Sequence, residues 1–435
     1  RKVQGKNHPA SNGNYHYCSH WIVIKEDVMI AVLEARSIIQ QHVLQLGKET
    51  VKLNDAGNRV LAQDILATFP MPRFDNSAMD GFAVRAADTK DASRSNPRSL
   101  KMVSISSAGA PSNVKLRTGE CAQCMTGATI PDGADTIIMV EDTSGFTDGD
   151  TIQIYLEAQL GKHIRRKGEE IQERDLLIPK GLVLTPGEIG TLATFGYGKL
   201  SVAKKPRIAI FGTGNELVEP GEELKPGQIY NSNLYVFAEL AERSGADIIM
   251  RDVIQDERES LRTFLSEALN SCDVVVSSGG VSMGRFDYVR DVFMELGVRE
   301  HFWKVAQKPG KPLFFGTGES TLIFGLPGNP VSSYIGFMEW VWPVLDIMMG
   351  KPDQKILTGI LKAPFPRDKM KYRFLFGKSW MEDGKLVCKS SVKVGSHMLS
   401  SSLESNCILG CEPGDGLLEP GEEISIRLLP WKTIQ

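Results

Sequence analysis

Three runs of apolar residues, at 207–211, 273–276 and 322–324, are each followed by a turn that contains glycine. Such runs, with helical stretches between them, are typical of buried strands in a doubly wound parallel sheet. Ligands of these sheets bind beyond the carboxyl ends of the strands. The three turns are therefore predicted to lie along one binding edge.

The turn after the third run has the sequence Leu-Pro-Gly-Asn-Pro at 326–330. Asn329 is a favoured helix N-cap, and Pro330 suits a first helical turn because its missing N–H has no partner there. Backbone amides at a helix start attract anions. An ordinary strand-to-helix connection has the same pattern, so both interpretations remain open at this point.

Apolar spacing also predicts the elements around this core. Positions at helical spacing predict a helix over 27–46, helical structure over 185–197 that could rejoin it, and a kinked core helix over 334–349. Asn233 is predicted to cap a helix that runs to Arg243 and ends at Gly245. Strand patterns occupy 136–140, 371–376, 385–388 and 424–428.

The predicted fold class is multidomain α/β plus β. A doubly wound α/β domain is expected at 205–350, an elongated α+β domain at 24–69 and 163–204 with a β insertion at 70–162, and a C-terminal β domain at 351–435. Residues 1–23 lack apolar periodicity and are expected to be a tail: a disordered segment, a processed end or a tag remnant.

Bulk composition narrows the classes of function. The 435 residues suggest several domains, and the net charge of −3 without a long basic run argues against a nucleic-acid binder. No run approaches the roughly 20 apolar residues of a membrane span. The seven cysteines have no framework spacing, so Cys121 and Cys124 are interpreted as buried thiols of a protein from a reducing compartment, the cytoplasm.

Carboxylates near the predicted binding edge suggest a metal site. Glu216 and Asp287 each follow a glycine turn, and two or three carboxylates gathered there would suit Mg²⁺, which takes oxygen ligands. Asp256 is explained by a helix cap with Glu259, and Asp80 could be a simple turn residue before Gly81. Solvated surface acids are the alternative interpretation.

Lysines form a cluster around a rigid Pro-Gly turn. Lys304, Lys308 and Lys311 suit phosphate or another oxyanion, although solvated surface lysines would look the same. A basic site beside an acidic metal site suggests chemistry on a phosphorylated substrate. Ser277, Ser278 and Ser282 lie near glycines, but no GxSxG elbow supports a hydrolase nucleophile.

Several long motifs occur along the chain: FDNSAMDGFAV (74–84), MTGATIPDGAD (125–135), IRRKGEEI (164–171), SSGGVSMGRFDY (277–288), KPGKP (308–312) and GLPGNPVS (325–332). In this order they resemble the molybdopterin molybdenumtransferase family, which includes bacterial MoeA and the E domain of gephyrin. The resemblance extends from about residue 24 to the end.

The resemblance implies both a fold and a reaction. It implies a molybdopterin-binding α/β domain at 205–350 and a homodimer whose cleft is shared between subunits. It also implies that molybdate is inserted into the dithiolene of adenylylated molybdopterin with Mg²⁺, which releases AMP and molybdenum cofactor. A molybdopterin adenylyltransferase is the expected pathway partner.

Matching positions suggest the site residues. The predicted catalytic residues are Asp80, Thr126, Glu216, Asp256, Asp287, Lys304 and Lys308, and three of them, Glu216, Asp256 and Asp287, are the predicted metal ligands. The predicted substrate-binding residues are Gly279, Gly280, Ser282, Lys311, Pro327, Gly328, Asn329 and Pro330, with Ser400 and Ser401 from a serine-bearing loop.

Four positions depart from patterns frequent in the family: Glu170, Asn215, Asn231 and Arg285. Asn215 also occurs in gephyrin-like sequences, whereas Arg285 reverses a charge two residues from Asp287. If acids at these positions were required, the chain would instead be a pterin-binding or peptide-binding scaffold. A tungstate-handling relative is a further alternative, because tungstate and molybdate have nearly the same size and charge.

Overall fold

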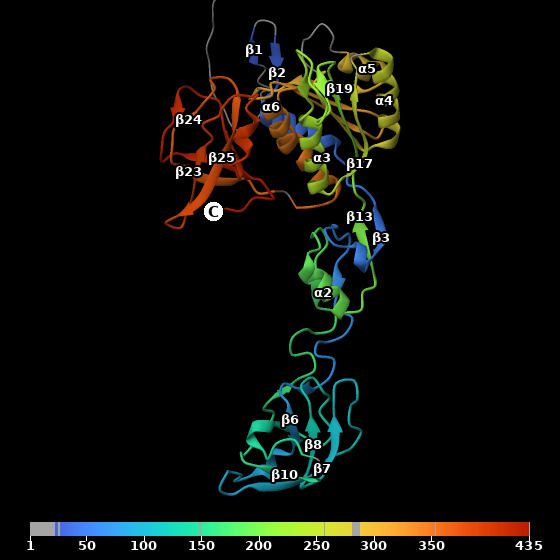
Figure 1. Ribbon diagram of the computed structural model, residues 1–435, viewed down its shortest axis with the longest axis vertical. Coiled ribbons are helices and arrows are strands. Elements are labelled where there is room, and N and C mark those ends of the chain that lie inside the picture. Colours follow the sequence, from blue (N-terminus) through green and yellow to red (C-terminus); the bar gives the residue numbers. More distant parts are fainter. Residues whose placement is uncertain are drawn as a thin grey trace, which may run out of the picture. The chain divides into compact units, whose positions relative to one another are not determined.

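The computed structural model describes residues 22–24, 27–147, 149–255, 257–280, 288–352 and 354–434 (Figure 1). They form two compact units. One consists of residues 50–57 and 61–201, and the other contains the described residues up to 49, residues 58–60 and the described residues from 202 onward. The chain passes between them near β3 (Lys48–Lys52) and β13 (Lys199–Ala203).

A six-stranded sheet forms the centre of the second unit, in the order β17-β14-β18-β22-β21-β19. Four strands are parallel: β17 (Asp247–Ile254), β14 (Arg207–Thr213), β18 (Val274–Ser278) and β22 (Leu322–Leu326). The remaining two, β21 (Pro312–Thr317) and β19 (Arg299–Lys304), are antiparallel. The three apolar runs are therefore strands of one parallel sheet, as predicted, and the structure places them next to one another.

Helices cover both faces of this sheet (Figure 1). Side chains of α4 (Arg258–Ser271) and α5 (Val289–Glu295) share one apolar cluster with Ala209, Val275 and Ile323. On the other face, α3 (Asn233–Ser244) packs against α6 (Pro330–Gly336). Alternate residues of β14, β18 and β22 are thus buried on opposite sides, which explains why these three strands are continuous apolar runs in the sequence.

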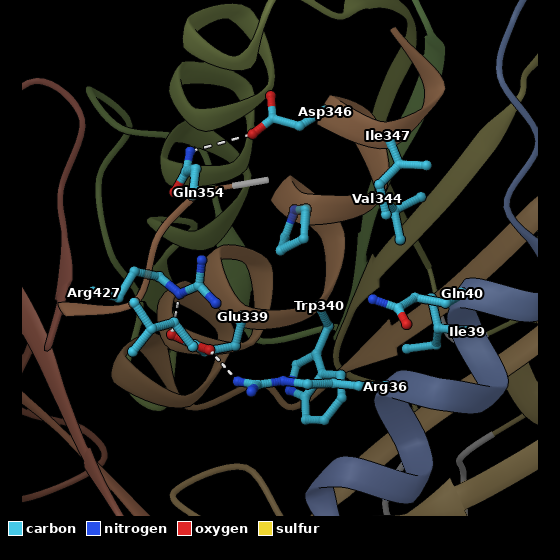
Figure 2. A pocket seen from close by; sticks show the side chains of 12 residues that line it. Arg36, Ile39, Gln40, Glu339, Trp340, Val344, Asp346, Ile347, Gln354 and Arg427 are labelled. Carbon is cyan, nitrogen blue, oxygen red and sulfur yellow. Dashed lines mark hydrogen bonds and ion pairs between the residues drawn. The ribbon is translucent and has the colours of Figure 1, made fainter. Parts of the chain in front are cut away.

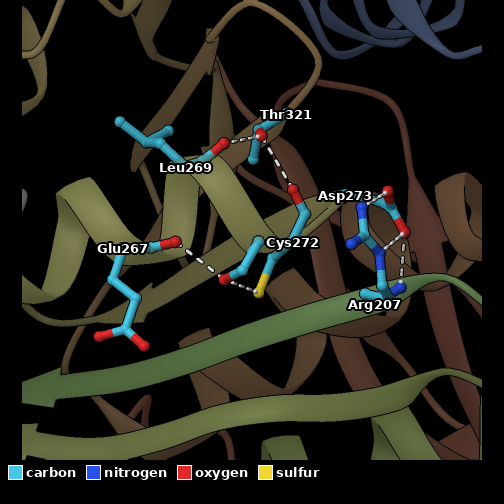
Figure 3. A network of polar contacts seen from close by, with 7 residues as sticks. Arg207, Glu267, Leu269, Cys272, Asp273 and Thr321 are labelled. Carbon is cyan, nitrogen blue, oxygen red and sulfur yellow. Dashed lines mark hydrogen bonds and ion pairs between the residues drawn. The ribbon is translucent and has the colours of Figure 1, made fainter.

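A polar network fixes where the parallel strands begin (Figure 3). Arg207 donates from its backbone N and its Nη2 to the carboxylate of Asp273, over 2.8 Å in each case. The hydroxyl of Thr321 donates to the carbonyls of Leu269 and Cys272, each 2.9 Å away. Because β14, β18 and β22 start in register, their glycine turns also emerge side by side at the opposite edge.

The first predicted helix is shorter than expected. Residues 27–29 form β2 (Asp27–Met29), which pairs with β1 (Ile22–Ile24), and α1 extends only over Val32–His42. The backbone of Ile30 exchanges hydrogen bonds with the backbones of Lys304 and Ala306, which belong to the same unit. These sheet-like bonds compete with helical ones and delay the helix start. Beyond His42, the N–H of Leu46 donates to the carbonyl of Met348 instead of continuing the helix.

The kinked core helix is present as three consecutive segments: α6, the π-helix η4 (Phe337–Val341) and α7 (Trp342–Met348). The π-helical segment immediately precedes Pro343, which has no N–H to donate to the carbonyl four residues earlier. Its residues, including Glu339 and Trp340, are buried. The kink therefore lies where the proline interrupts the helical bonding pattern.

The C-terminal segment forms a barrel-like sheet in the order β20-β25-β26-β23-β29-β27, closed by an additional β25–β27 pairing. Its strands are β20 (Gln307–Lys308), β25 (Tyr372–Glu382), β26 (Lys385–Ser390), β23 (Leu357–Leu361), β29 (Glu423–Leu428) and β27 (Cys407–Cys411). The three strands expected from the sequence are β25, β26 and β29. Short segments β15 (Leu217–Val218), β16 (Ile229–Tyr230), β24 (Phe365–Pro366), β28 (Leu417–Leu418) and η5 (Leu399–Ser402) complete this unit.

The other unit contains a five-stranded sheet in the order β10-β7-β8-β6-β9. These strands are β10 (Thr151–Ile154), β7 (Arg98–Ser106), β8 (Glu120–Cys124), β6 (Gly81–Val84) and β9 (Thr136–Met139). Cys121 and Cys124 of β8 lie in apolar clusters, and burial raises their pKa to about 12 and about 11. They are buried thiols, as expected from the sequence.

Smaller elements complete this unit: η1 (Leu53–Asp55), η2 (Ala86–Thr89), η3 (Val140–Asp142), α2 (Pro186–Thr194) and the strand pairs β11 (Ile164–Arg165) with β5 (Asn76–Ser77) and β12 (Leu176–Ile178) with β4 (Ile65–Leu66). α2 begins with a capping box between Thr185 and Glu188. Across the described parts of both units, no helix is long and apolar enough to cross a membrane.

Candidate functional site

A cavity of about 460 Å³ lies at the carboxyl edge of the parallel sheet. Predicted site residues among its lining are Gly279, Gly280, Lys308, Pro327, Gly328 and Asn329. The lining also contains Ser332, Arg373, Val394, Gly395 and Ser396, which the sequence did not single out. It is completed by Pro309, Gly310 and Pro312 of the loop that carries Lys308 and Lys311, called the lysine loop below. The cavity thus joins the turns after β18 and β22 to the lysine loop and the barrel.

The turn after β18 requires glycine. Gly279 and Gly280 have φ of 86° and 71°, which L-residues with side chains rarely adopt. A Cβ on Gly280 would also lie only 2.3 Å from Cγ2 of Val289. The amide of Gly279 donates to the carbonyl of Leu326, 2.9 Å away, so this turn is bound to the end of β22. Bare backbone is therefore exposed where a ligand can approach closely.

Asn233 has a different role from the predicted helix cap. It is the first residue of α3, and its Nδ2 donates to the Ser278 hydroxyl and to the Gly328 carbonyl, both 2.7 Å away. The helix does end at Gly245, in a left-handed conformation, as predicted. The Asn233 amide thus holds the two glycine turns together.

Two cations lie on neighbouring strands at the cavity, Lys308 on β20 and Arg373 on β25. Lys308 pairs with Arg373 in a short parallel ladder, and its Nζ lies 3.2 Å from a carboxylate oxygen of Asp368. Burial raises the pKa of Asp368, but the Met370 amide and the Lys308 ammonium outweigh that effect and hold it below its usual value. Asp368 is therefore ionised, and it balances one of the two positive charges.

Arg373 lines the cavity and is a candidate functional residue that sequence reasoning missed. Only 8% of it is exposed, and burial lowers its pKa. Its Nε has no hydrogen-bond partner among the described residues. An arginine between Tyr372 and Phe374 in a strand pattern was the available signal, because a charge within an apolar run needs a partner or a function.

Other predicted residues lie around the cavity without lining it. Lys304 is buried at the end of β19, with its Nζ 4.4 Å from the Trp303 ring centroid. The carbonyl of Lys311 accepts a bond from the Val305 amide, and Pro330 opens α6, with Asn329 at the N-cap. Asn329 thus occupies the predicted N-cap position, but its side chain makes no capping hydrogen bond.

The serine-bearing loop includes η5. Ser400 is exposed and its hydroxyl accepts a hydrogen bond of 3.0 Å from Lys393, whereas Ser401 is buried. The carbonyl of Ser396, earlier in this loop, accepts from the Val331 amide of α6. The loop therefore reaches the cavity through residues 394–396 and not through the two predicted serines.

The predicted acidic cluster is only partly described. Glu216 is exposed and follows β14, and its carboxylate lies beside Gly214. Asp256, Asp287 and Ser282, together with Arg285, lie outside the described residues. Within the described ranges, no three acidic, histidine or cysteine side chains are grouped as metal ligands.

Asp80 and Thr126 lie together in the five-stranded unit. Oδ1 of Asp80 accepts bonds from the Thr126 backbone N–H at 2.7 Å and from its hydroxyl at 2.8 Å. These two donors, the backbone amide foremost, hold the pKa of Asp80 below its usual value. The exposed carboxylate is therefore a fixed negative charge near neutral pH.

The remaining sequence departures occupy ordinary positions. Asn231 is buried, and its amide donates to the Glu219 carboxylate over 2.9 Å, so it has a structural partner. Glu170 lines a separate cavity of about 750 Å³ in the five-stranded unit, next to Glu169 and Arg165. Asn215 is exposed in the turn after β14.

Family models match three consecutive parts of the chain. They are described as the MoeA N-terminal region (domain I and II) at residues 30–196, a probable molybdopterin binding domain at 209–346, and the MoeA C-terminal region (domain IV) at 358–429. The cavity is therefore lined by the second and third of these regions, and Asp80 and Thr126 lie in the first.

Individual proteins are similar over nearly the whole chain. A molybdopterin molybdenumtransferase of Bacillus subtilis is 34% identical over 89% of this chain and 93% of its own length, and one of Haemophilus influenzae is 33% identical over 92% and 98%. The crystal structure of a molybdopterin biosynthesis MoeA protein from Pyrococcus horikoshii OT3 has a TM-score of 0.75 at 31% identity, covering 92% of this chain and all of that one. The chain belongs to the MoeA family of molybdopterin molybdenumtransferases.

Proposed function

We propose that this protein inserts molybdate into the dithiolene of molybdopterin. The observation that carries the proposal is the cavity at the sheet edge, where glycine backbone without side chains meets Lys308 and the buried Arg373. The glycines allow close approach of a phosphate-bearing pterin. The two cations suit the molybdate dianion. Relatives with the name molybdopterin molybdenumtransferase support the same reaction.

The proposed substrate is adenylylated molybdopterin, and AMP is released together with molybdenum cofactor. The protein contributes by positioning the reactants and by stabilising negative charge, while the dithiolene sulfurs bind the metal. Gly279, Gly280 and the Pro327–Asn329 turn would hold the pterin phosphate, and Lys308 with Arg373 would hold molybdate. Lys304 and Lys311 would add positive charge behind the cavity.

Mg²⁺ is part of this proposal. Glu216 supplies a carboxylate at the sheet edge, in keeping with the oxygen ligands that Mg²⁺ prefers, and Asp256 and Asp287 would complete the set. When bound, Mg²⁺ would neutralise phosphate oxygens of the adenylylated substrate. Glu216 itself would orient that end of the substrate.

We also propose a homodimer with a cleft shared between subunits. The Asp80–Thr126 pair of one subunit would then face the cavity of its partner, where a fixed carboxylate can orient the pterin. A molybdopterin adenylyltransferase would supply the substrate. The proposed compartment is the cytoplasm, in keeping with the free, buried cysteines of the described residues.

Single-turnover molybdenum insertion tests the proposal. The protein is given adenylylated molybdopterin, molybdate and Mg²⁺, and AMP release is followed together with cofactor activity. Both are expected in the native protein, and both should decrease in Lys308→Met and in Asp287→Ala. The matched control is Lys369→Met, because Lys369 is an exposed lysine that pairs with Asp415 away from the cavity lining.

Three results are informative. Cofactor formation with AMP release in the native protein supports the transferase. Pterin binding without either product would refute it and favour a pterin-binding scaffold. A higher kcat/KM for the insertion of tungstate than for the insertion of molybdate would show that this protein is the tungstate-handling relative.

A further inference from the structure

The lysine loop at the cavity rests on a buried chain of hydrogen bonds. Gln307, which is 1% exposed, donates from Nε2 to the Gly310 carbonyl over 2.8 Å. Its Oε1 accepts a 3.0 Å bond from the indole Nε1 of Trp340. One side-chain amide therefore joins the loop that carries Lys308 to the core helix segment η4.

This loop fits tightly against that amide. Gly310 has φ of 85°, and a Cβ on it would lie 2.9 Å from Nε2 of Gln307. On the other side, β20 pairs Gln307 with Tyr372 and Lys308 with Arg373. The loop is thus fixed by its backbone to the strand of Arg373 and by the Gln307 side chain to the helix.

Trp340 is itself a fixed anchor. It lines a second cavity of about 190 Å³ together with Arg36, Glu339 and Arg427, and the Arg36 guanidinium lies 5.9 Å from its ring centroid (Figure 2). Glu339 binds both arginines over 2.8 Å. The indole N–H that holds Gln307 is therefore kept in place by contacts with α1 and the barrel.

We propose that Gln307 is a positioning residue for the anion site. It makes no contact with substrate; it sets where Lys308 stands relative to Arg373 by holding the Gly310 carbonyl. An uncharged amide suits this role because it accepts at one end and donates at the other. The inference rests on the proposed function only in taking molybdate as the anion.

Equilibrium dialysis of molybdate against the full-length protein tests this role, because it reports affinity separately from the number of sites. Gln307→Met leaves the Gly310 carbonyl without its donor, and molybdate affinity is expected to fall roughly tenfold. Gln307→Glu should also weaken binding, since a carboxylate cannot donate to that carbonyl. The matched control is Gln354→Met, whose glutamine lines the second cavity and donates to Asp346 instead.

A double-mutant cycle separates positioning from general damage. If Gln307 acts by placing Lys308, then Gln307→Met should change affinity by less than about twofold in a Lys308→Met background. Equal losses in both backgrounds, or unchanged affinity in Gln307→Met, would overturn the inference. Native protein that binds molybdate without inserting it would refute only the proposed reaction, and native protein that binds no molybdate would refute both.

Discussion

Arg373→Met is expected to weaken anion binding while the fold becomes no less stable, which is an unusual combination for a buried residue. Burial lowers the pKa of Arg373, and its Nε has no hydrogen-bond partner among the described residues. A buried polar group without a partner costs about 1–3 kcal/mol. Methionine fills similar space without that cost, so the free energy of unfolding should stay equal or increase.

The expected functional loss is worked from the same contacts. A hydrogen bond to a charged group contributes about 1.5–3 kcal/mol, which corresponds to roughly 10-fold to 100-fold in molybdate affinity. Dialysis of molybdate measures the affinity, and thermal unfolding measures the stability. A stability gain of about 1 kcal/mol would raise the midpoint by roughly 2–4 °C in a unit of this size.

Arg427→Met provides the matched comparison. Arg427 is 9% exposed, nearly the same as the 8% of Arg373, but its Nε donates to Glu339 over 2.8 Å (Figure 2). Its removal should lower the unfolding midpoint and reduce molybdate affinity far less than Arg373→Met does, because Arg427 reaches the anion site only through Glu339 and the contacts of Trp340. A lower midpoint for Arg373→Met with unchanged affinity would refute the reasoning, because Arg373 would then be a structural residue.

Three other predictions concern Glu339, Thr126 and Cys407. Glu339→Gln leaves Arg36 and Arg427 without the negative charge that both contact, so it should destabilise the fold by about 3–5 kcal/mol. Thermal unfolding measures this loss, and an unchanged midpoint would contradict the prediction. Thr126→Val removes one donor to Asp80, and because those donors favour the ionised carboxylate, the pKa of Asp80 should rise toward its usual value; carboxyl NMR titration measures the shift, and an unchanged pKa would contradict it. Burial raises the pKa of the Cys407 thiol to about 12, so it should not react with an aromatic disulfide near neutral pH until the protein unfolds; rapid reaction in the folded state would show that the thiol is accessible.

The sequence was sufficient for the strands and glycine turns of the binding edge. Apolar runs indicate strands that are buried on both faces of a parallel sheet. Glycine-containing turns indicate positions that need an unusual backbone conformation, such as the positive φ of Gly279 and Gly280. Both signals come from neighbouring residues. They were enough to predict three parallel strands with their turns on one edge, whereas the order β14-β18-β22 came from the structure.

Boundaries and side-chain partners could not be predicted in the same way. Apolar spacing continues from β2 into α1, so the pattern alone placed the helix start too early. The backbone of Ile30 instead bonds to Lys304 and Ala306, which are hundreds of positions away. Asparagine is a residue type favoured at helix N-caps, so the sequence predicted a cap at Asn233. Its side-chain amide comes within hydrogen-bonding distance of Ser278 and Gly328 only in the folded sheet.

Charged residues inside apolar runs mark the limit of local reasoning. Arg373 stands between Tyr372 and Phe374, and Glu339 stands between Met338 and Trp340, so the sequence gives both the same appearance. Their surroundings in the structure differ. Two arginines form ion pairs with Glu339. The Nε of Arg373, in contrast, has no hydrogen-bond partner among the described residues, and its side chain lines the cavity. Because a buried charge must be compensated by the protein or by a ligand, the two ion pairs make Glu339 structural, whereas we expect Arg373 to bind an anion. That distinction depends on residues far apart in the chain, so only the structure could reveal it.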